Sequence, residues 1–379
     1  MRPGTLGSAT LVAILSTSVP AAAAPSLAEL AVGVDRIFGE IDERSLPGCA
    51  VGVVHDGHYL LARGYGLANL EHDIPVTTRT VFRIGSVSKQ FTAMAIAILA
   101  ERGDLDLDAD VHDYLPELRS YGHTVTVRQM IHHVAGMGDY DEDLFVKADG
   151  RPFRFGNEDY MTTAEFFQKV KDVPLRRPPG ETWEYSNLGY FLLGQVVERV
   201  SGKTLREFAA AEIFNPLGMR STFFNDNVDQ PVRNRAGGYR LMDDGSYEIY
   251  MTNLDWVGDG GVFTTIDDFI EWDRNFYSNR LGKGSTALIE QVTSPLPGVA
   301  ARNNDLFGQS GYAFGYFVGT SHGEPVIGHT GGWVGFSSVY LRYPELRLSV
   351  VTFCNSTDHE ASDFGSRVAE IYVRSLRPE

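Results

Sequence analysis

The stretch Phe82-Arg83-Ile84-Gly85-Ser86-Val87-Ser88-Lys89 marks a change of pattern in the chain. It begins as a short apolar run of the kind that forms a β-strand. After Ser86, apolar residues recur at helical spacing (Phe91, Met94, Ile98), and this helix is expected to end near Gly103. The chain is therefore expected to pass from strand-rich to helix-rich structure at Ser86.

Strand patterns lie on both sides of a helical middle. Residues 27–45 have the apolar spacing of a helix, and strand-like runs follow at 49–54 and 59–65, joined by the hairpin signal Asp56-Gly57. The segment from about 105 to 255 is helix-rich. Further expected elements are helices at 190–200, 266–276 and about 362–375, and strands at 312–318, 325–328, 337–341 and 348–353.

This order predicts an α/β chain of the α+β type. One sheet is built from both chain termini and flanked by helices, and a mostly helical domain is inserted in it. We expect the sheet part at about 27–85 and 257–379, and the helical part at about 86–256.

Composition narrows the class of protein. The 379 residues are 43% hydrophobic, which is enough for a large core. The 33 basic and 49 acidic residues give a net charge of −16, so the chain repels nucleic acids and anionic membranes. We therefore expect no nucleic-acid partner.

The N-terminus has the pattern of an export signal. A basic residue follows Met1, residues 11–15 are apolar, and residues 21–24 are alanines that suit a signal peptidase. A signal peptide over residues 1–24 leaves a mature chain, 25–379, that begins near Ala24 or Pro25; a retained N-terminal tail is the alternative. We see no later run apolar and long enough for a membrane helix, so a periplasmic or extracellular location is expected.

The two cysteines, Cys49 and Cys354, each lie in or beside a strand-like run. In an exported protein they can form one disulfide, and two buried thiols are the alternative. Neither lies in a C-x-x-C spacing, and histidines do not occur at H-x-x-x-H or H-x-H spacing, so no metal or other cofactor is expected.

Three short motifs carry residue types suited to catalysis. Ser86-x-x-Lys89 places an amine one helical turn from a hydroxyl at a helix start. Tyr185-Ser186-Asn187 precedes a helix and offers a proton carrier and an amide. The segment 329–332, in a Gly-rich connection between strands, offers donors and a backbone that a ligand can approach closely. Taken singly, helix caps and a tight turn explain them equally well.

In this order the three motifs resemble the set of the penicillin-recognising serine hydrolases, in the branch related to class C β-lactamases. The resemblance covers about 30–375 and includes the stretches 47–57, 260–265 and 331–338. This branch includes D-alanyl-D-alanine carboxypeptidases, D-aminopeptidases and family VIII esterases. The resemblance implies a β-lactamase/DD-peptidase-like fold with an antiparallel sheet, and a small-molecule or peptide substrate.

The chemistry implied by the resemblance is acyl transfer, in which Ser86 attacks a carbonyl and forms an acyl-enzyme. Lys89 accepts the proton only when neutral, and lowering its pKa from about 10.4 to about 7 takes roughly 4 kcal/mol. Burial would supply this, as would a second cation such as protonated His329. Tyr185 is the competing base.

The resemblance assigns substrate binding to Asn187, His329, Thr330, Gly331 and Gly332, and the oxyanion hole to the backbone N–H groups of Ser86 and Gly332. Tyr140 and Trp333 are candidates for the mouth of the site.

Two departures from the family pattern bear on the substrate. His133-Val134-Ala135-Gly136-Met137 stands where many relatives have His-Thr-Ser-Gly-Leu, and this loop lacks two hydroxyls. His329 stands where class C β-lactamases usually have Lys, which favours the peptidase side of the branch over efficient β-lactam hydrolysis.

A competing nucleophile is Ser321, in a G-x-S-x-G pattern. That pattern is functional between a strand and a helix, whereas a second strand is expected here, so we interpret it as a hairpin loop.

The sequence favours a D-amino-acid peptidase or carboxypeptidase-type hydrolase. A family VIII-type carboxylesterase or weak β-lactamase is the first alternative. A non-catalytic penicillin- or cell-wall-ligand-binding protein is the second.

Overall fold

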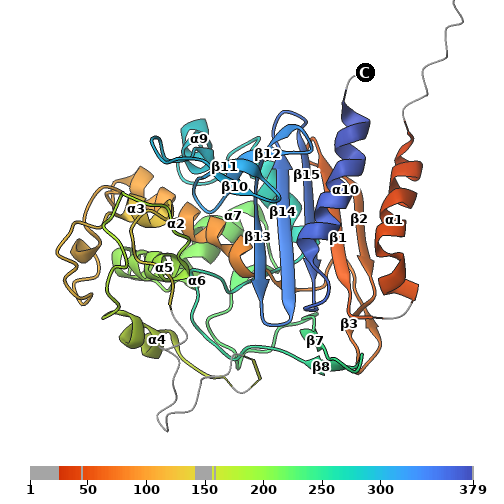
Figure 1. The fold of residues 1–379 in the computed structure, drawn as a ribbon, viewed down its shortest axis with the longest axis horizontal. Helices are drawn as coiled ribbons and strands as arrows, with labels where there is room; N and C mark the ends of the chain where they lie inside the picture. The colour runs from red at the N-terminus through yellow and green to blue at the C-terminus, as the bar shows by residue number, and fades with distance from the viewer. Residues whose placement is uncertain (1–24, 44–45, 141–155, 158, 378–379) are drawn as a thin grey trace, which may run out of the picture.

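The main sheet joins the two ends of the chain. The computed structural model describes residues 25–43, 46–140, 156–157 and 159–377, so the expected signal peptide lies outside the described residues. Eight antiparallel strands have the order β10-β11-β12-β13-β14-β15-β1-β2. The hairpin of β1 (Cys49–His55) and β2 (His58–Tyr65) therefore pairs with the last strand, β15 (Leu348–Cys354), and the predicted architecture is confirmed (Figure 1).

Local sequence explains the first hairpin. Its turn residues Asp56 and Gly57 both have positive φ, 50° and 73°, as a two-residue hairpin turn requires. The remaining strands of the sheet are β10 (Arg302–Asn304), β11 (Gly308–Tyr312), β12 (Phe317–Ser321), β13 (Glu324–Trp333) and β14 (Phe336–Tyr343).

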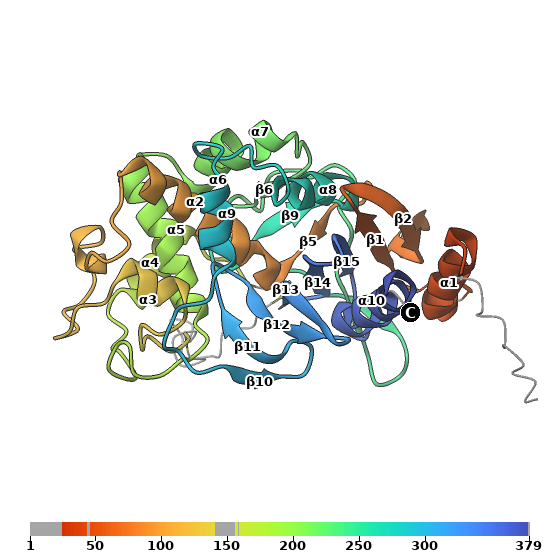
Figure 2. The ribbon, with the colours of Figure 1, turned by 90° about the horizontal axis from the view of Figure 1, so that it is seen from above.

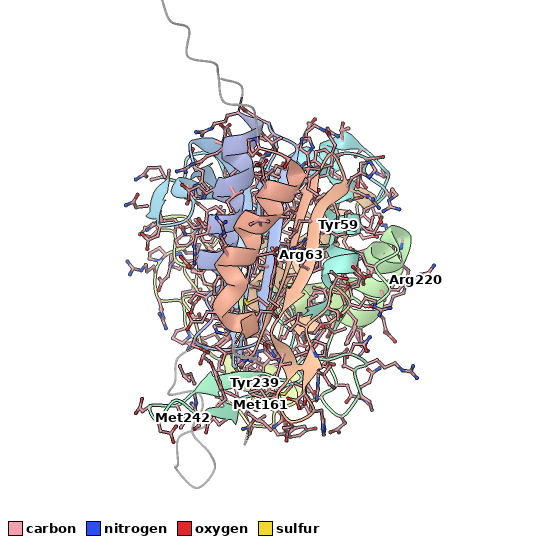
Figure 3. The ribbon with its side chains drawn as sticks, turned by 90° about the vertical axis from the view of Figure 1, so that its right-hand side faces the viewer. Tyr59, Arg63, Met161, Arg220, Tyr239 and Met242 are labelled. Atoms are coloured by element: carbon pink, nitrogen blue, oxygen red, sulfur yellow. A yellow bond between two sulfur atoms is a disulfide. The ribbon has the colours of Figure 1, made fainter. Side chains whose placement is uncertain are left out.

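Helices cover both faces of the sheet (Figure 2). On one face lie α1 (Leu27–Glu43) and α10 (Ala361–Leu376), and on the other lies α8 (Ile266–Asn275). Consequently β14 and β15 are buried along their whole length. Arg63 on β2 (Figure 3) forms an ion pair with Asp35 of α1. The Tyr65 hydroxyl donates to the same carboxylate at 2.7 Å.

The helical part is built around α2 (Lys89–Arg102), which is buried from Lys89 to Leu99. It ends, as predicted, at Gly103, which has φ 86°. The other helices of the described chain are α3 (Val127–Ile131), α4 (Thr163–Val170), α5 (Asn187–Ser201), α6 (Leu205–Ala209), α7 (Asn215–Leu217) and α9 (Thr286–Thr293). Among the described residues, short strands form three minor sheets. The first contains β5 (Phe82–Arg83), β9 (Val262–Thr264) and β6 (Phe223–Phe224), the second β3 (Leu67–Asn69) and β4 (Ile74–Pro75), and the third β7 (Tyr239–Leu241) and β8 (Tyr247–Ile249).

Two predictions about strands are wrong. The expected strand at 312–318 is interrupted at 313–316, where Gly315 has φ 81° and its backbone packs so closely on α2 that a Cβ would lie 2.5 Å from the Gln90 nitrogen. The segment 329–332 is not a connection between strands, because β13 continues to Trp333 and pairs with β14 up to Phe336. The third motif therefore lies on a rigid strand.

The two cysteines form a disulfide. Cys49 on β1 and Cys354 on β15 are direct partners in the antiparallel register, with Cα atoms 4.1 Å apart, and both are fully buried. The bridge therefore joins the first and last strands of the main sheet in chain order, β1 and β15, which are neighbours near its β2 edge. No helix among the described residues is long and apolar enough to cross a membrane.

Replacing both Cys49 and Cys354 by Ala should lower the free energy of unfolding by about 2–4 kcal/mol, because the bridge closes a very long loop. Urea unfolding followed by circular dichroism measures the difference, and dithiothreitol should have a similar effect on the wild-type protein and none on the variant. Equal stability of the two proteins under oxidising conditions would contradict the disulfide.

Candidate active site

A tight turn presents the candidate nucleophile. Ser86 lies in the 3₁₀ turn η1 (Gly85–Ser88), between β5 and α2. Gly85 has φ 49°, and a Cβ there would lie 2.7 Å from the Gly332 nitrogen. A Cβ on Gly331 would lie 2.2 Å from the Ile84 oxygen and 3.0 Å from the Ser86 nitrogen. Glycine at both positions lets the turn pack directly on β13, which brings the backbone of Ser86 beside Gly331 and Gly332.

The amine of Lys89 has three oxygen neighbours. Its Nζ lies 3.0 Å from Ser86 Oγ, 2.6 Å from Asn187 Oδ1 and 2.6 Å from the backbone oxygen of Asp259. The last two atoms are carbonyl oxygens and can only accept. A neutral amine has two N–H bonds and one lone pair, so if both N–H bonds go to these carbonyls, the lone pair is left facing Ser86.

Burial makes that neutral form accessible. Lys89 has no exposed surface, and burial lowers the pKa of its amine from 10.5 to about 8, although the nearby carboxylates of Asp259 and Asp139 oppose the shift. At pH 7 about one molecule in ten then carries the neutral amine, against fewer than about one in a thousand for an ordinary lysine.

Tyr185 also lies beside the amine, with the Lys89 Nζ 4.9 Å from its ring centre. Burial raises the pKa of its phenol above the ordinary value, and a hydrogen bond with Ser86 partly offsets this. The phenolate is therefore scarce near neutral pH. The geometry suits Tyr185 as a neutral hydroxyl that relays a proton, and Lys89 as the group that accepts it.

The second motif is held by hydrogen bonds at each of its residues. Ser186 caps α5 by accepting from the Gly189 N–H at 2.9 Å, and its own N–H donates to His133 Nδ1 at 3.1 Å. Asn187 Nδ2 donates to Asp139 Oδ2 at 2.8 Å, which directs Oδ1 toward Lys89. Thus His133, in the loop that departs from the family pattern, positions the backbone between Tyr185 and Asn187.

His329 does not supply the second cation that the sequence suggested. It is 2% exposed, and burial lowers its pKa to about 3, so the ring is neutral at pH 7. Its Nδ1 lies against the Thr330 oxygen and Nε2 lies 3.0 Å from the Tyr312 hydroxyl, so both nitrogens have partners inside the protein. Burial of Lys89, rather than a charge on His329, is what lowers the lysine pKa. Thr330, Gly331 and Gly332 follow on β13, opposite Val339, Ser338 and Ser337 of β14.

A narrow cleft of about 40 Å³ opens beside Ser86. Asn187 and Gly332 line it, and so do Tyr140 and Trp333, the two residues expected at the mouth. It is also lined by Arg83, Trp256 and Asp259, which the sequence did not single out. The Tyr140 hydroxyl donates to Asp259 Oδ2 at 2.7 Å. The cleft is thus bounded by aromatic rings and contains a buried carboxylate.

Arg83 is a buried cation in this cleft. It is 6% exposed, its guanidinium lies 5.7 Å from the centre of the Trp333 ring, and burial lowers its pKa to about 10. Among the described residues, its Nε has no hydrogen-bond partner. Arg83 directly precedes the Ile-Gly-Ser turn, and Asp259 directly precedes Gly260-Gly261. Both stretches belong to the resemblance seen in the sequence, so their neighbours Arg83 and Asp259 could have been predicted as site residues from that position.

Ser321 lies where the hairpin interpretation places it. It ends β12 and pairs with Glu324 at the start of β13, with His322 and Gly323 in the turn. The structure has a strand, a turn and a strand at this point, so the nucleophile elbow of an α/β-hydrolase is absent from this segment.

Comparison with known proteins identifies the family. The model of the family described as Beta-lactamase matches residues 34–371. The chain belongs to this family. It is a serine hydrolase that acts through an acyl-enzyme on amide or ester bonds, and the arrangement around Ser86 is consistent with that chemistry.

Several proteins with different names are similar to this chain. A penicillin-binding protein of Bacillus subtilis is 27% identical over 86% of the chain and 72% of its own length. A D-aminopeptidase of Cereibacter sphaeroides is 29% identical over 83% of the chain, which spans 57% of that enzyme. The structure of an octameric penicillin-binding protein homologue from Pyrococcus abyssi matches with a TM-score of 0.78 and 26% identity, covering 92% of this chain and 78% of that one.

Lys89→Met should lower kcat/KM by about 10³–10⁴-fold on any substrate, because it removes the proton acceptor while keeping the volume of the side chain. Tyr185→Phe should cost only about 10–100-fold, because a relay can be replaced by water. Steady-state kinetics on one ester substrate, with melting temperatures as the control for folding, distinguishes them. A larger loss in Tyr185→Phe than in Lys89→Met would contradict Lys89 as the acceptor.

Proposed function

We propose that this chain is an exported D-aminopeptidase-type hydrolase, which releases a small N-terminal D-residue from a peptide or amide. The observation that carries the proposal is the pair of carboxylates beside the Lys89–Asn187 contact. Asp139 accepts from Asn187, and Asp259 lies in the cleft, 7% exposed. Partly desolvated carboxylates at this place suit a protonated α-amine on the acyl side of the reacting carbonyl.

The size of the cleft supports a small acyl group. Tyr140, Trp256 and Trp333 bound a space of only about 40 Å³ next to Ser86. A residue such as D-alanine suits these walls better than one with a long side chain. The similarity to D-aminopeptidases supports the same substrate class, although the chain spans little more than half of their length.

The proposed reaction uses the residues already described. The Ser86 hydroxyl attacks the carbonyl while its proton passes to the Lys89 amine, and the oxyanion is held by the N–H groups of Ser86 and Gly332. The C–N bond then breaks, and the leaving amine takes the proton from Lys89 through the Tyr185 hydroxyl. Water hydrolyses the resulting ester by the same steps in reverse order, which restores Ser86.

Export is part of the proposal. The Cys49–Cys354 disulfide supports it, because such bridges persist in oxidising compartments. The pattern of residues 1–24 supports a cleaved signal peptide. Mass spectrometry of the mature protein should find a terminus near Ala24 or Pro25, and a cytoplasmic chain that retains Met1 would contradict export.

A panel of substrates tests the proposed activity. We expect D-Ala-p-nitroanilide to have a higher kcat/KM than its L-isomer, and nitrocefin to be hydrolysed poorly. Hydrolysis of p-nitrophenyl butyrate without any hydrolysis of the D-anilide would instead indicate a carboxylesterase, which the aromatic walls also suit. If neither fluorescent penicillin nor a fluorophosphonate labelled the folded protein more than Ser86→Ala, the chain would be a non-catalytic binding protein.

Asp259→Asn tests the amine contact directly. Loss of a charged hydrogen-bond partner should lower kcat/KM for D-Ala-p-nitroanilide by about 10–100-fold. N-acetyl-D-Ala-p-nitroanilide, which lacks the charge, should be hydrolysed no more slowly by the variant than by the wild type. Asp363→Asn, on α10, is the matched control. An equal loss on both anilides would show that Asp259 does not bind the amine.

A further inference from the structure

Arg83 lines the narrow cleft beside Ser86 as a buried cation without a counterion. It is 6% exposed, and within the described chain its guanidinium forms neither an ion pair nor a hydrogen bond. Burial lowers its pKa only to about 10, so the side chain stays charged at pH 7. Burying a charge is costly unless a group of opposite charge accompanies it. The guanidinium therefore lacks a partner that a bound ligand can supply.

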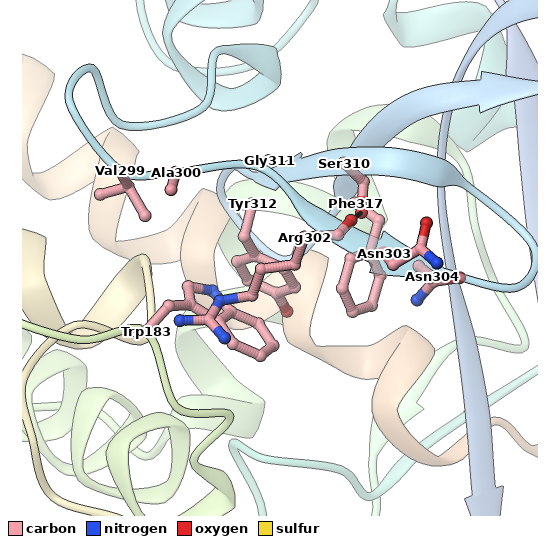
Figure 4. Close-up of a pocket in the computed structure, with 10 residues that line it drawn as sticks. All are labelled: Trp183, Val299, Ala300, Arg302, Asn303, Asn304, Ser310, Gly311, Tyr312 and Phe317. Carbon is pink, nitrogen blue, oxygen red and sulfur yellow. Dashed lines mark hydrogen bonds between the residues drawn. The ribbon is translucent and has the colours of Figure 1, made fainter.

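Two other arginines show what is unusual about Arg83. Arg342 on β14 is buried to the same extent, and it lies 3.7 Å from the carboxylate of Asp273 on α8. Arg302 lies over the Trp183 ring in a larger cavity of about 440 Å³ (Figure 4), and it is exposed, so water hydrates its charge. Arg83 has neither a carboxylate at ion-pair distance nor ready access to bulk water.

The carboxylates closest in effect to Arg83 have other partners. The charges of Asp259 and Asp159 both act to raise its pKa, but neither residue forms an ion pair with it. Asp159 accepts from the backbone N–H of Asn253 at 2.7 Å. Asp259 accepts from the Tyr140 hydroxyl and itself lines the cleft, where the proposed function assigns it to the substrate α-amine. The cleft thus presents one negative and one positive group as separate partners.

The elements that hold the nucleophile also fix the position of Arg83. It lies on β5, where it pairs with Phe263 of β9, and it precedes Ser86 by three residues. Its guanidinium lies 5.7 Å from the centre of the Trp333 ring, and Trp333 directly follows Gly332 on β13. A carbonyl held between Ser86 and Gly332 therefore has its acyl substituent in the same narrow cleft as the guanidinium.

We propose that Arg83 selects an N-terminal D-residue with a short anionic side chain, D-aspartate. This inference rests on the proposed aminopeptidase function and names the residue that the enzyme releases. The substrate α-amine pairs with Asp259 and the side-chain carboxylate pairs with Arg83, while Ser86 attacks the carbonyl. The opposite orientation brings like charges together. The small volume of the cleft, about 40 Å³, favours D-aspartate over the longer D-glutamate. The bond broken and the path of the proton are those of the proposed reaction.

Two anilides of equal size test the charge pairing, D-Asp-α-p-nitroanilide and D-Asn-p-nitroanilide. The wild type should hydrolyse the aspartyl anilide with a kcat/KM at least about tenfold higher, because only its side chain is charged. Arg83→Gln should reduce this ratio to one or below, mainly through KM, whereas Arg367→Gln on α10 should leave it unchanged. General damage to the serine turn cancels in the ratio. A wild-type ratio of one or below, or a ratio that Arg83→Gln leaves unchanged, would overturn the proposal.

Arg83→Lys is the second variant, for the case that removal of the charge prevents folding. It keeps a cation but loses the planar, two-pronged donor that matches a carboxylate. The ratio between the two anilides should fall at least about threefold and stay above one. Melting temperatures report folding of both variants. An unchanged ratio in Arg83→Lys would show that Arg83 does not contact the side-chain carboxylate.

A binding measurement separates this inference from the proposed function. Succinamate has an amide and a carboxylate two carbons apart and no amine, and succinamide is its neutral counterpart. Tryptophan fluorescence of the Ser86→Ala protein, in which Trp256 and Trp333 line the cleft, should show at least fivefold tighter binding of succinamate. Arg83→Gln in that background should remove the difference.

The two proposals fail in different ways. If the wild type hydrolyses only esters but succinamate binds through Arg83, the aminopeptidase proposal fails and the anion-binding role of Arg83 stands. If D-Ala-p-nitroanilide is hydrolysed but succinamate and succinamide bind equally, the aminopeptidase proposal stands and the role of Arg83 is overturned. Absence of succinamate binding, or tighter binding that Arg83→Gln leaves unchanged, overturns that role as well.

Discussion

The active site depends on a single constraint, the exclusion of water from the Lys89 amine. A lysine in water is charged at neutral pH and cannot take a proton from serine. Here the amine is fully buried, and its three contacts come from residues 86, 187 and 259, which lie far apart in the sequence. The contact among these three segments is also the point where the helical part meets the sheet. Packing of the two parts of the fold therefore sets the chemistry of the amine.

Glycine and burial position the groups around that amine. Gly85 and Gly331 allow the serine turn to lie on β13 without side chains between them, which brings the N–H groups of Ser86 and Gly332 to the same place. The apolar residues of α2 are buried on all sides, so Lys89 cannot turn toward solvent. Buried neutral histidines complete the support, since His133 accepts from the Ser186 N–H and His329 contacts Tyr312. Both act through hydrogen bonds rather than charge.

Sequence predicted the elements that depend on local pattern and missed those that depend on distant contacts. The first hairpin, the ends of α2 and α5 at glycines, and the start of α8 follow from spacing and turn residues. The break at Gly315 was missed because it follows from packing against α2, and the length of β13 depends on its pairing with β14. The disulfide stayed open because the register of strands 305 residues apart cannot be inferred from either run.

The same division applies to the site. Ser86, Lys89, Tyr185 and Asn187 were indicated by the order of short motifs, and the structure brings all four together. Arg83, Asp139 and Asp259 are common residue types in unremarkable positions, and only the fold shows that they surround the cleft. Of the two contributions considered for lowering the Lys89 pKa, burial and a protonated His329, the structure supports burial, because burial also keeps His329 neutral.

The most direct test of this account is the pH dependence of covalent labelling of Ser86 by a small fluorophosphonate. The labelling rate should rise about tenfold per pH unit and level off above an apparent pKa near 8, because only neutral Lys89 accepts the serine proton. The Lys89→Met protein should show no such rise. A rise centred near 10, as for an exposed lysine, or a rate independent of pH between 6 and 9, would contradict the claim that a buried neutral lysine activates Ser86.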